Sequence, residues 1–175
     1  MTIRELAGFA AAYPTLDPDA VDYEYLRKVS QQLVPFGQHV GTLISEISAD
    51  RSVVEIPASD TVTNQMGTVH AGALFTAADI AGAAAFVGAA AHRLHTVERL
   101  VLRGAWASYR KPAQGRIRAV ATVDAQELAP LLAATSAGRF ELSGKATLLD
   151  DRDVTVAKFT FDYVVDVTST GTAAQ

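Results

Sequence analysis

The sequence predicts an α+β fold in which an antiparallel sheet of about six strands wraps around one long helix. Residues 70–91 form a proline-free stretch rich in alanine and glycine, which favours a helix that a curved sheet can approach closely. The segments before and after this stretch change to the period-two alternation that is typical of strands. Turn-forming residues separate these strands, as hairpins require.

The N-terminal part of the chain is expected to be helical. Residues 1–20 hold two prolines and a short apolar run, which predict one loose helix. Residues 21–36 have apolar side chains close to a helical period, and Pro35 is expected to end that helix. These apolar residues are Tyr25, Leu26, Val29 and Leu33. We therefore expect a helical extension over residues 1–37.

A hairpin and a polar loop connect this extension to the central helix. Residues 40–58 contain two β-rich runs around the turn ADRS, which is a hairpin pattern. The polar loop SDTVTNQMGTV then leads into the helix. After the helix, residues 96–110 and 116–124 predict two strands that are joined by the turn KPAQG.

A short helix and a final hairpin complete the predicted fold. The helix is expected within residues 124–138, because Asp124 and Glu127 fit a capping box and Gly138 suits the C-terminal end. Pro130 fits this helix only if it begins a few residues late. The last two strands, RFELSGKATLL and VTVAKFTFDYVV, flank the turn DDRD.

Length and composition limit the classes of function. The 175 residues predict one domain of ordinary size, which we place at residues 38–167, followed by a disordered tail over residues 168–175. The net charge of −4 and the pI of 5.5 argue against nucleic acid as a partner. The absence of cysteine excludes disulfides, a thiolate nucleophile and cysteine-ligated metal centres. The first residues lack a basic leader, so we expect a cytoplasmic location.

The central segment is also long enough to be weighed as a membrane helix. Residues 71–91 carry one charge, Asp79. Alanine and glycine dominate the segment, however, and a central aspartate costs about 3 kcal/mol on insertion into a bilayer. We therefore expect a core helix and no membrane insertion.

Asp79 is the residue that most needs an explanation. An unpaired ionised carboxylate in an apolar setting is unfavourable, so it needs a partner, a water molecule or a chemical task. On a helix, Asp79 shares a face with Thr76 and Gly82, whereas His70 falls at the helix start on the opposite side. His70 and Asp79 of one chain need not meet, although two chains could bring them together. In the alternative interpretation, Asp79 is a buried polar residue that Thr76 or a backbone group satisfies.

The start of the helix is a second candidate for chemistry. The peptide between His70 and Ala71 lies where free N–H groups and a partial positive charge could polarise a carbonyl oxygen. Asn64 could donate a second hydrogen bond to that oxygen. In the alternative interpretation, Asn64 and Gly67 only satisfy a turn, and His70 is only a cap.

Basic residues after the helix could hold the phosphates of a nucleotide-bearing ligand by charge and hydrogen bonds, or could simply be solvated. They are Arg99, Arg103, Arg110, Lys111, Arg116 and Arg118. His92 and His95 lack the neighbouring ligands of a metal site. The sequence has neither a phosphate-binding glycine loop in a strand–helix context nor a serine-hydrolase elbow. No metal or cofactor is therefore expected.

The segment that begins at Asn64 is similar to a known active site. Asn64, Gly67, His70 and Gly72, followed by Asp79, resemble the active-site segment of the hotdog-fold acyl-CoA thioesterases, particularly the phenylacetate-pathway type. The later segment SYRKPAQGRIRA is similar to that family's strand–turn–strand, in which an aromatic residue precedes a Pro-Ala turn. The short helix before the final hairpin is more similar to a poorly characterised branch of the same superfamily.

The resemblance implies a hotdog fold, assembled as a homodimer or a dimer of dimers with active sites at the subunit interface. It implies that Asp79 acts as general base or nucleophile toward an acyl-CoA thioester and that the Ala71 N–H stabilises the oxyanion. Asn64 and His70 of the other chain would position the carbonyl or a water molecule, and Gly72 completes the catalytic set. The expected substrate-binding residues are Gly67, Thr76, Arg110 and Lys111.

Two differences from the family keep other functions open. The family often has two glycines after the histidine, and here the first is Ala71. Many relatives also place a serine or threonine on the strand after the helix, whereas ERLVLRG has neither. A non-catalytic module that binds acyl ligands is therefore the main alternative. A dehydratase acting on hydroxyacyl thioesters fits less well, because its histidine and acidic residue have a different spacing.

Overall fold

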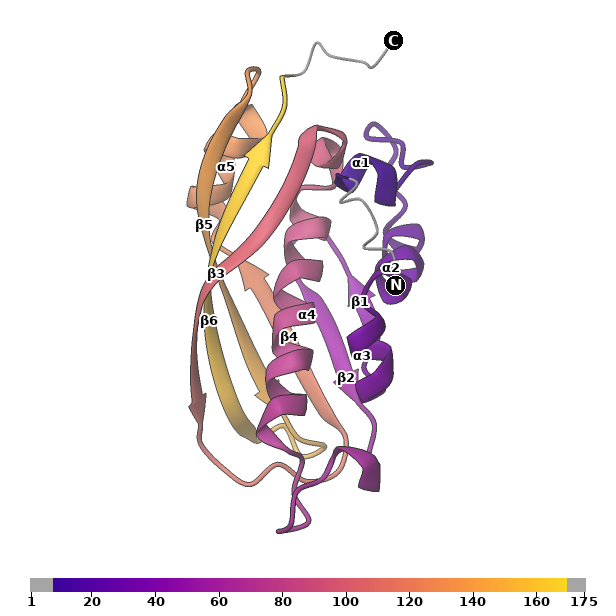
Figure 1. Cartoon of the computed structure of the whole chain (residues 1–175), viewed down its shortest axis with the longest axis vertical. Coiled ribbons are helices and arrows are strands. Elements are labelled where there is room, and N and C mark those ends of the chain that lie inside the picture. Colours follow the sequence, from indigo (N-terminus) through magenta and orange to yellow (C-terminus); the bar gives the residue numbers. More distant parts are fainter. Residues whose placement is uncertain (1–7, 170–175) are drawn as a thin grey trace, which may run out of the picture.

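The computed structural model describes residues 8–169 and shows a six-stranded antiparallel sheet wrapped around the long helix α4 (Ala71–Ala89) (Figure 1). The strands follow the order β1-β2-β4-β5-β6-β3 across the sheet. Their bounds are β1 (Leu43–Ile47), β2 (Ser52–Ile56), β3 (Val97–Tyr109), β4 (Ile117–Val123), β5 (Gly138–Leu149) and β6 (Thr155–Val167). This confirms the predicted α+β fold, the central helix and the hairpins β1–β2 and β5–β6. The segment KPAQG joins β3 to β4 but forms no hairpin, because β3 pairs with β6 and β4 pairs with β2 and β5.

Small side chains allow the sheet to close on α4. A Cβ atom on Gly88 would lie 2.0 Å from the carbonyl oxygen of Ser48, and one on Gly82 would lie 2.2 Å from the Tyr163 hydroxyl. Neither position has room for a side chain, so glycine is required for this packing. The core around α4 is filled by aromatic residues such as Phe86 and Phe159, which are almost fully buried.

Alternation along the strands divides the sheet into an inner face, which packs on α4, and an outer face. On β6, the inner side chains are buried and the intervening ones, Lys158, Thr160 and Asp162, are exposed. The inner residues of β6 are Ala157, Phe159, Phe161, Tyr163 and Val165. The sequence alternation therefore predicts the two faces of this strand correctly.

Helix α4 is long and apolar enough to cross a membrane, but 67% of the relevant window is buried inside the fold. That burial is what a core helix requires. Helix α4 ends at Ala89, slightly earlier than the expected residue 91, and the 3₁₀ helix η2 (Ala91–Thr96) follows it. A second 3₁₀ helix, η1 (Asp60–Val62), lies in the loop before α4.

The N-terminal region contains α1 (Phe9–Ala12), α2 (Tyr23–Leu33) and α3 (Pro35–Val40). Asp22 caps α2, whose amide hydrogens at Glu24 and Tyr25 bond to the aspartate side chain. Helix α2 ends just before Pro35, as predicted, but Pro35 does more than end that helix. It begins α3, because proline is well suited to the first position of a helix, where its missing N–H costs nothing.

The capping box that was predicted for α5 (Ala125–Ala133) forms only in part. Asp124 caps this helix by accepting hydrogen bonds from the N–H groups of Gln126 and Glu127. The Glu127 carboxylate does not return to Asp124. It accepts a hydrogen bond of 2.6 Å from the N–H of Ser143, while the Asp124 N–H donates to the Ser143 carbonyl. Pairing with β5 therefore replaces the second half of the box.

Two further expectations for this region are wrong. Pro130 lies inside α5, where its exposed position lets water satisfy the backbone carbonyl that proline leaves unbonded. Gly138 does not end the helix, since α5 stops at Ala133 and Gly138 is the first residue of β5.

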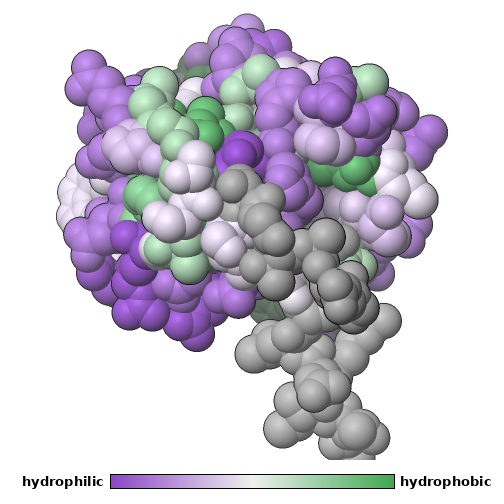
Figure 2. All heavy atoms as spheres, turned by 90° about the horizontal axis from the view of Figure 1, so that it is seen from above, coloured by the Kyte–Doolittle hydropathy of each residue, from purple (hydrophilic) through white to green (hydrophobic). Residues whose placement is uncertain are grey.

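The end of the molecule that lies at the top of Figure 1 is mostly hydrophilic, with small apolar areas between the polar residues (Figure 2). Thr168 extends the last strand with a hydrogen bond of 2.8 Å from its N–H to the Thr96 carbonyl. Residues 170–175 of the predicted disordered tail, and residues 1–7 of the predicted N-terminal extension, lie outside the described residues.

Candidate active site

His70 is the N-cap of α4. Its backbone is extended, with φ −62° and ψ 138°, and its Nδ1 atom accepts a hydrogen bond of 2.9 Å from the N–H of Gly72. A ring nitrogen that accepts in this way carries no proton, so the neutral imidazole has its proton on Nε2. The exposed Nε2–H is left to donate to a ligand at the start of the helix. His70 is thus a cap, as one interpretation predicted, but a cap with a free donor.

Ala71 supplies a second donor at the same place. It is the first residue of α4, so its N–H has no acceptor within the helix, and within residues 8–169 no side chain accepts from it. The residue is exposed. A free N–H at the positive end of a helix dipole is suited to an oxyanion or a polarised carbonyl.

Asn64 organises the turn that precedes the helix. Its Oδ1 accepts from the N–H of Met66 at 2.9 Å, and its Nδ2 donates to the Thr68 hydroxyl at 2.9 Å. The Asn64 carbonyl accepts from the N–H of Gly67, whose φ of 70° is the left-handed conformation that favours glycine. The interpretation that Asn64 and Gly67 build a turn is therefore correct. One of the two amide hydrogens of Asn64 stays available for a ligand.

Asp79 lies about two turns along α4 and is half-buried. It has neither a hydrogen bond nor an ion pair to any residue in the described part of the chain. Thr76 does not satisfy it, because the Thr76 hydroxyl donates instead to the Gly72 carbonyl at 2.8 Å. The alternative that Thr76 is the partner of Asp79 is therefore wrong. Burial raises the pKa of the Asp79 carboxyl above its usual range, which is the direction a general base needs.

The two halves of the predicted catalytic set are far apart in one protomer. Asp79 is nine residues beyond His70, which places it about 13 Å along the helix axis. Asn64, His70, Ala71 and Gly72 are together at the helix start, but Asp79 is not with them. The separation agrees with the expectation that His70 and Asp79 of one chain need not meet.

The turn between β3 and β4 lies against the start of α4. The Tyr109 hydroxyl donates to the Ala71 carbonyl at 3.3 Å, and the N–H of Val69 donates to the Ala113 carbonyl at 2.8 Å. Arg110 and Lys111 follow Tyr109 and are exposed. Two cationic residues therefore follow directly in the chain after the tyrosine that contacts the start of the helix.

Arg110 and Lys111 differ from the other basic residues of this region. The other four pair with carboxylates on neighbouring strands and turns, namely Arg99 with Asp166, Arg103 with Glu141, Arg116 with Asp151 and Arg118 with Asp153. Arg110 and Lys111 form no ion pair within residues 8–169. They are the members of the predicted basic group that stay free for an anionic ligand.

A cavity of about 600 Å³ opens beside the first turns of α4. Three predicted site residues, His70, Gly72 and Thr76, line it. Its other lining residues are mostly apolar and come from α3, from the loop around η1 and from α4, namely Phe36, His39, Val40, Thr61, Val62, Thr63, Ala73 and Phe75. The cavity therefore places these predicted site residues next to an apolar surface that the sequence did not predict.

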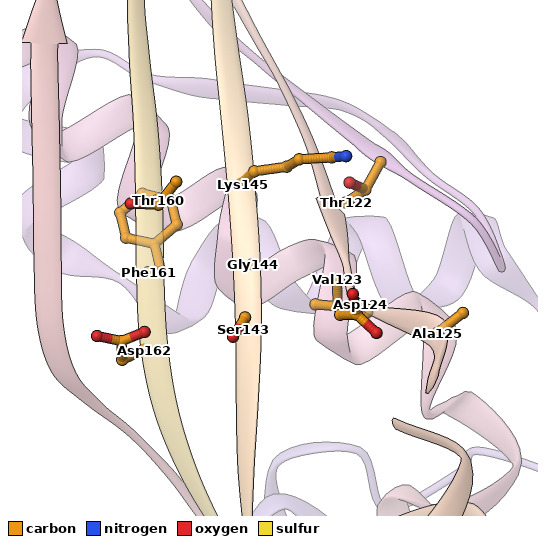
Figure 3. A pocket seen from close by; sticks show the side chains of 10 residues that line it. All are labelled: Thr122, Val123, Asp124, Ala125, Ser143, Gly144, Lys145, Thr160, Phe161 and Asp162. Atoms are coloured by element: carbon orange, nitrogen blue, oxygen red, sulfur yellow. The ribbon is translucent and has the colours of Figure 1, made fainter. Parts of the chain in front are cut away.

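A second hollow, of about 440 Å³, lies by the outer face of the sheet and α5 (Figure 3). The polar side chains that line it include Ser143, Lys145, Thr160 and Asp162. It contains none of the predicted site residues.

Three aromatic residues near the site were not assigned a role from the sequence. Phe36 is 63% exposed at the cavity wall, and Tyr109 contacts the start of α4. Tyr163 packs over Gly82, one turn beyond Asp79. The position of Phe36 directly after Pro35 could have indicated that it has a role. The sequence gives no such indication for Tyr163, because this residue belongs to an alternating strand that also contains two phenylalanines.

Asp79 is expected to destabilise the folded protein at neutral pH. Because burial raises its folded-state pKa above the ordinary value of 3.8, the folded state binds this proton more tightly than the unfolded state. Its contribution to stability therefore falls as the pH rises from 3.8 through the folded-state pKa. Asp79→Asn should melt at a higher temperature than the wild type at pH 7, and the difference should shrink in acid. Thermal unfolding followed by circular dichroism measures this, and a lower melting temperature at pH 7 would contradict it.

Comparison with protein families shows a match to the model for DUF4442, a domain of unknown function, over residues 23–165. No curated protein matches the chain.

Solved structures with the same fold include a probable thioesterase and a protein related to the thioesterase superfamily. A probable thioesterase from Pseudomonas aeruginosa is 24% identical, with a TM-score of 0.65 over 82% of this chain and 95% of that one. A Shewanella oneidensis protein related to the thioesterase superfamily is 20% identical, with a TM-score of 0.62 over 81% and 93%. The E. coli PaaI protein of the phenylacetic acid degradation operon is 19% identical, with a TM-score of 0.54 over 73% and 85%. The chain therefore has the hotdog fold that these structures share.

Proposed function

The chain belongs to the DUF4442 family, and we propose that it is a thioesterase that hydrolyses acyl- or aryl-CoA thioesters to the free acid and CoA. The observation that carries this proposal is Asp79, a half-buried carboxylate that has no partner within residues 8–169. It lies on the helix whose first N–H, that of Ala71, is free to bind an oxygen. The resemblance of the fold to thioesterases supports the same reaction.

The donors at the helix start are suited to the carbonyl of a thioester. The Ala71 N–H would bind the carbonyl oxygen and stabilise the negative charge that develops on it. The Nε2–H of His70 and the remaining amide hydrogen of Asn64 would orient the same carbonyl or the attacking water. The Asp79 carboxylate would take a proton from that water as its oxygen bonds to the acyl carbon. The C–S bond then breaks, and the thiolate of CoA takes up the proton that Asp79 accepted, which returns the carboxylate to its ionised state.

This reaction needs two chains. Asp79 lies about 13 Å along the helix from His70, so we propose that Asp79 of one chain works with His70 and Asn64 of a second copy. Strand β3 is at one edge of the sheet, where its outer backbone groups can pair with the same strand of another chain. A homodimer through this edge, alone or as half of a dimer of dimers, would build two equivalent sites.

The cavity beside α4 suggests how the substrate lies. Its apolar wall, with Phe36, Val40 and Phe75, is suited to an acyl or aryl group. Arg110 and Lys111, which form no ion pair within the described chain, would hold the phosphates of CoA by charge and hydrogen bonds. The thioester would lie between them, at the start of α4.

Truncation of the cavity wall is expected to weaken binding of the acyl group. Phe36→Ala should raise KM for apolar acyl-CoA substrates by about fivefold to tenfold, because it removes apolar surface that the acyl group would cover. Leu33→Ala is the matched control, since Leu33 is an exposed apolar residue on α2 that does not line the cavity. Equal KM values for Phe36→Ala and the wild type across the panel would show that the acyl group lies elsewhere.

A binding module without turnover is the second candidate. The inner positions of β3 after the helix are leucines, Leu100 and Leu102, and they offer no hydroxyl to hold a water molecule. A panel of medium-chain, long-chain and aromatic acyl-CoA thioesters separates the two functions. Hydrolysis of at least one member supports the thioesterase. Binding of the panel without release of free CoA supports the module.

A further inference from the structure

The hydroxyl group of Tyr163 is buried without a hydrogen-bond partner. Tyr163 is 1% exposed, and no residue within the described chain accepts from or donates to its Oη atom. The hydroxyl of Tyr13, another buried tyrosine, bonds in contrast to the Ser30 hydroxyl at 2.7 Å. Because an unpaired buried hydroxyl is unfavourable, Tyr163 needs an acceptor that this arrangement does not yet supply.

The position of the hydroxyl points to α4. It lies against Gly82, where a Cβ atom would be only 2.2 Å from Oη. Asp79 is three residues earlier on the same helix, so its side chain projects from the same face one turn away. The neighbours of Tyr163 on the adjacent strands are Leu102 and Leu142, which are apolar and offer no side-chain acceptor.

Few other titratable groups face this part of α4. On the inner face of the sheet, the only other titratable side chain in the described strands is Tyr109, which donates to the Ala71 carbonyl. His39 on α3 and His70 line the cavity beside the first turns of the helix. Burial, together with the charge of Asp79, raises the pKa of the Tyr163 phenol, so this phenol keeps its proton and can donate.

We propose that Tyr163 is a positioning residue whose hydroxyl donates a hydrogen bond to the Asp79 carboxylate, directly or through one water molecule. This bond would hold the carboxylate ionised and orient it toward the thioester. It would also supply the acceptor that the buried hydroxyl lacks. The effect on turnover rests on the proposed thioesterase function, whereas the hydrogen bond itself does not.

The test is Tyr163→Phe, which removes only the hydroxyl and keeps the ring in the core. Loss of a donor to the carboxylate should raise the pKa of Asp79 by about one unit or more, as followed by NMR titration of the Asp79 carboxyl carbon. Tyr13→Phe is the matched control, because it removes a buried hydroxyl that bonds to Ser30, and it should leave that pKa unchanged. An Asp79 pKa that is unchanged or lower in Tyr163→Phe would overturn the proposal.

A converse measurement does not depend on the fold of Tyr163→Phe. In Asp79→Asn the pKa of Tyr163 should fall, because the charge that raises it is gone, and an unchanged value would count against the contact. In the assay, Tyr163→Phe should lower kcat by about tenfold with little change in KM and should shift the acid limb of the pH profile upward. If the wild type hydrolyses no thioester, the function fails, but the two titrations still decide whether the hydrogen bond forms.

Discussion

Asp79→Ala is expected to lower kcat for thioester hydrolysis by about a hundredfold to ten-thousandfold, the usual contribution of a general base. The variant should fold normally, because the half-buried carboxylate forms no hydrogen bond or ion pair within the described chain that the fold depends on. Rates of CoA release measured on the best substrate of the acyl-CoA panel provide the test, with circular dichroism to verify the fold.

The matched control for this experiment is Asp162→Ala. Asp162 is an exposed carboxylate on the outer face of β6, away from the helix, so its removal should leave kcat unchanged. If Asp79→Ala keeps most of the wild-type activity, Asp79 is neither the base nor the nucleophile. A loss of activity in both variants would show that net charge, and not this position, controls the rate.

Gly88→Ala is expected to lower the free energy of unfolding by about 3 kcal/mol. The added Cβ would lie 2.0 Å from the carbonyl oxygen of Ser48 and 2.9 Å from the Ile47 side chain, so the turn between β1 and β2 would have to move. In a helix that nothing packs against at this position, the change from glycine to alanine stabilises by about 1 kcal/mol. The sign of the change in the free energy of unfolding therefore shows whether the sheet packs tightly against Gly88. Urea unfolding curves measure the difference.

Gly72→Ala is the control within the same helix. Its Cβ would meet only the His70 ring, at 3.1 Å, and a side chain moves more easily than a backbone. The loss of stability in Gly72→Ala should therefore be much smaller than in Gly88→Ala. Stabilisation by Gly88→Ala would mean that the sheet does not close on α4 as tightly as the structure shows.

The central helix, the strands and the start of the site could be predicted because their signals are local. The alanine-rich run after His70 and the alternation of β6 depend on neighbouring residues, and so does the turn that Asn64 and Gly67 form. Glu127 shows the limit of such reasoning, since its carboxylate bonds to Ser143, which comes near only when β5 joins the sheet.

Features that depend on distant pairing could not be predicted. A basic residue forms an ion pair only where a neighbouring strand or turn brings a carboxylate close to it. Arg118 pairs with Asp153 in this way, whereas Arg110 pairs with no acid in the described chain. The role inferred for Tyr163 depends on its hydroxyl meeting Gly82, which is remote in the sequence. In the alternating pattern of β6 this tyrosine is equivalent to Phe159 and Phe161.

Mixing two inactive variants tests most directly whether Asp79 of one chain works with His70 of another. Asp79→Ala and His70→Ala are each purified, partly unfolded together and refolded so that their subunits exchange. Half of the resulting dimers would carry both variants, and each of these would contain one intact site, so about one quarter of the wild-type hydrolysis should return. Activity no higher than the mean of the two separate variants, although exchange has occurred, would contradict a site shared between chains.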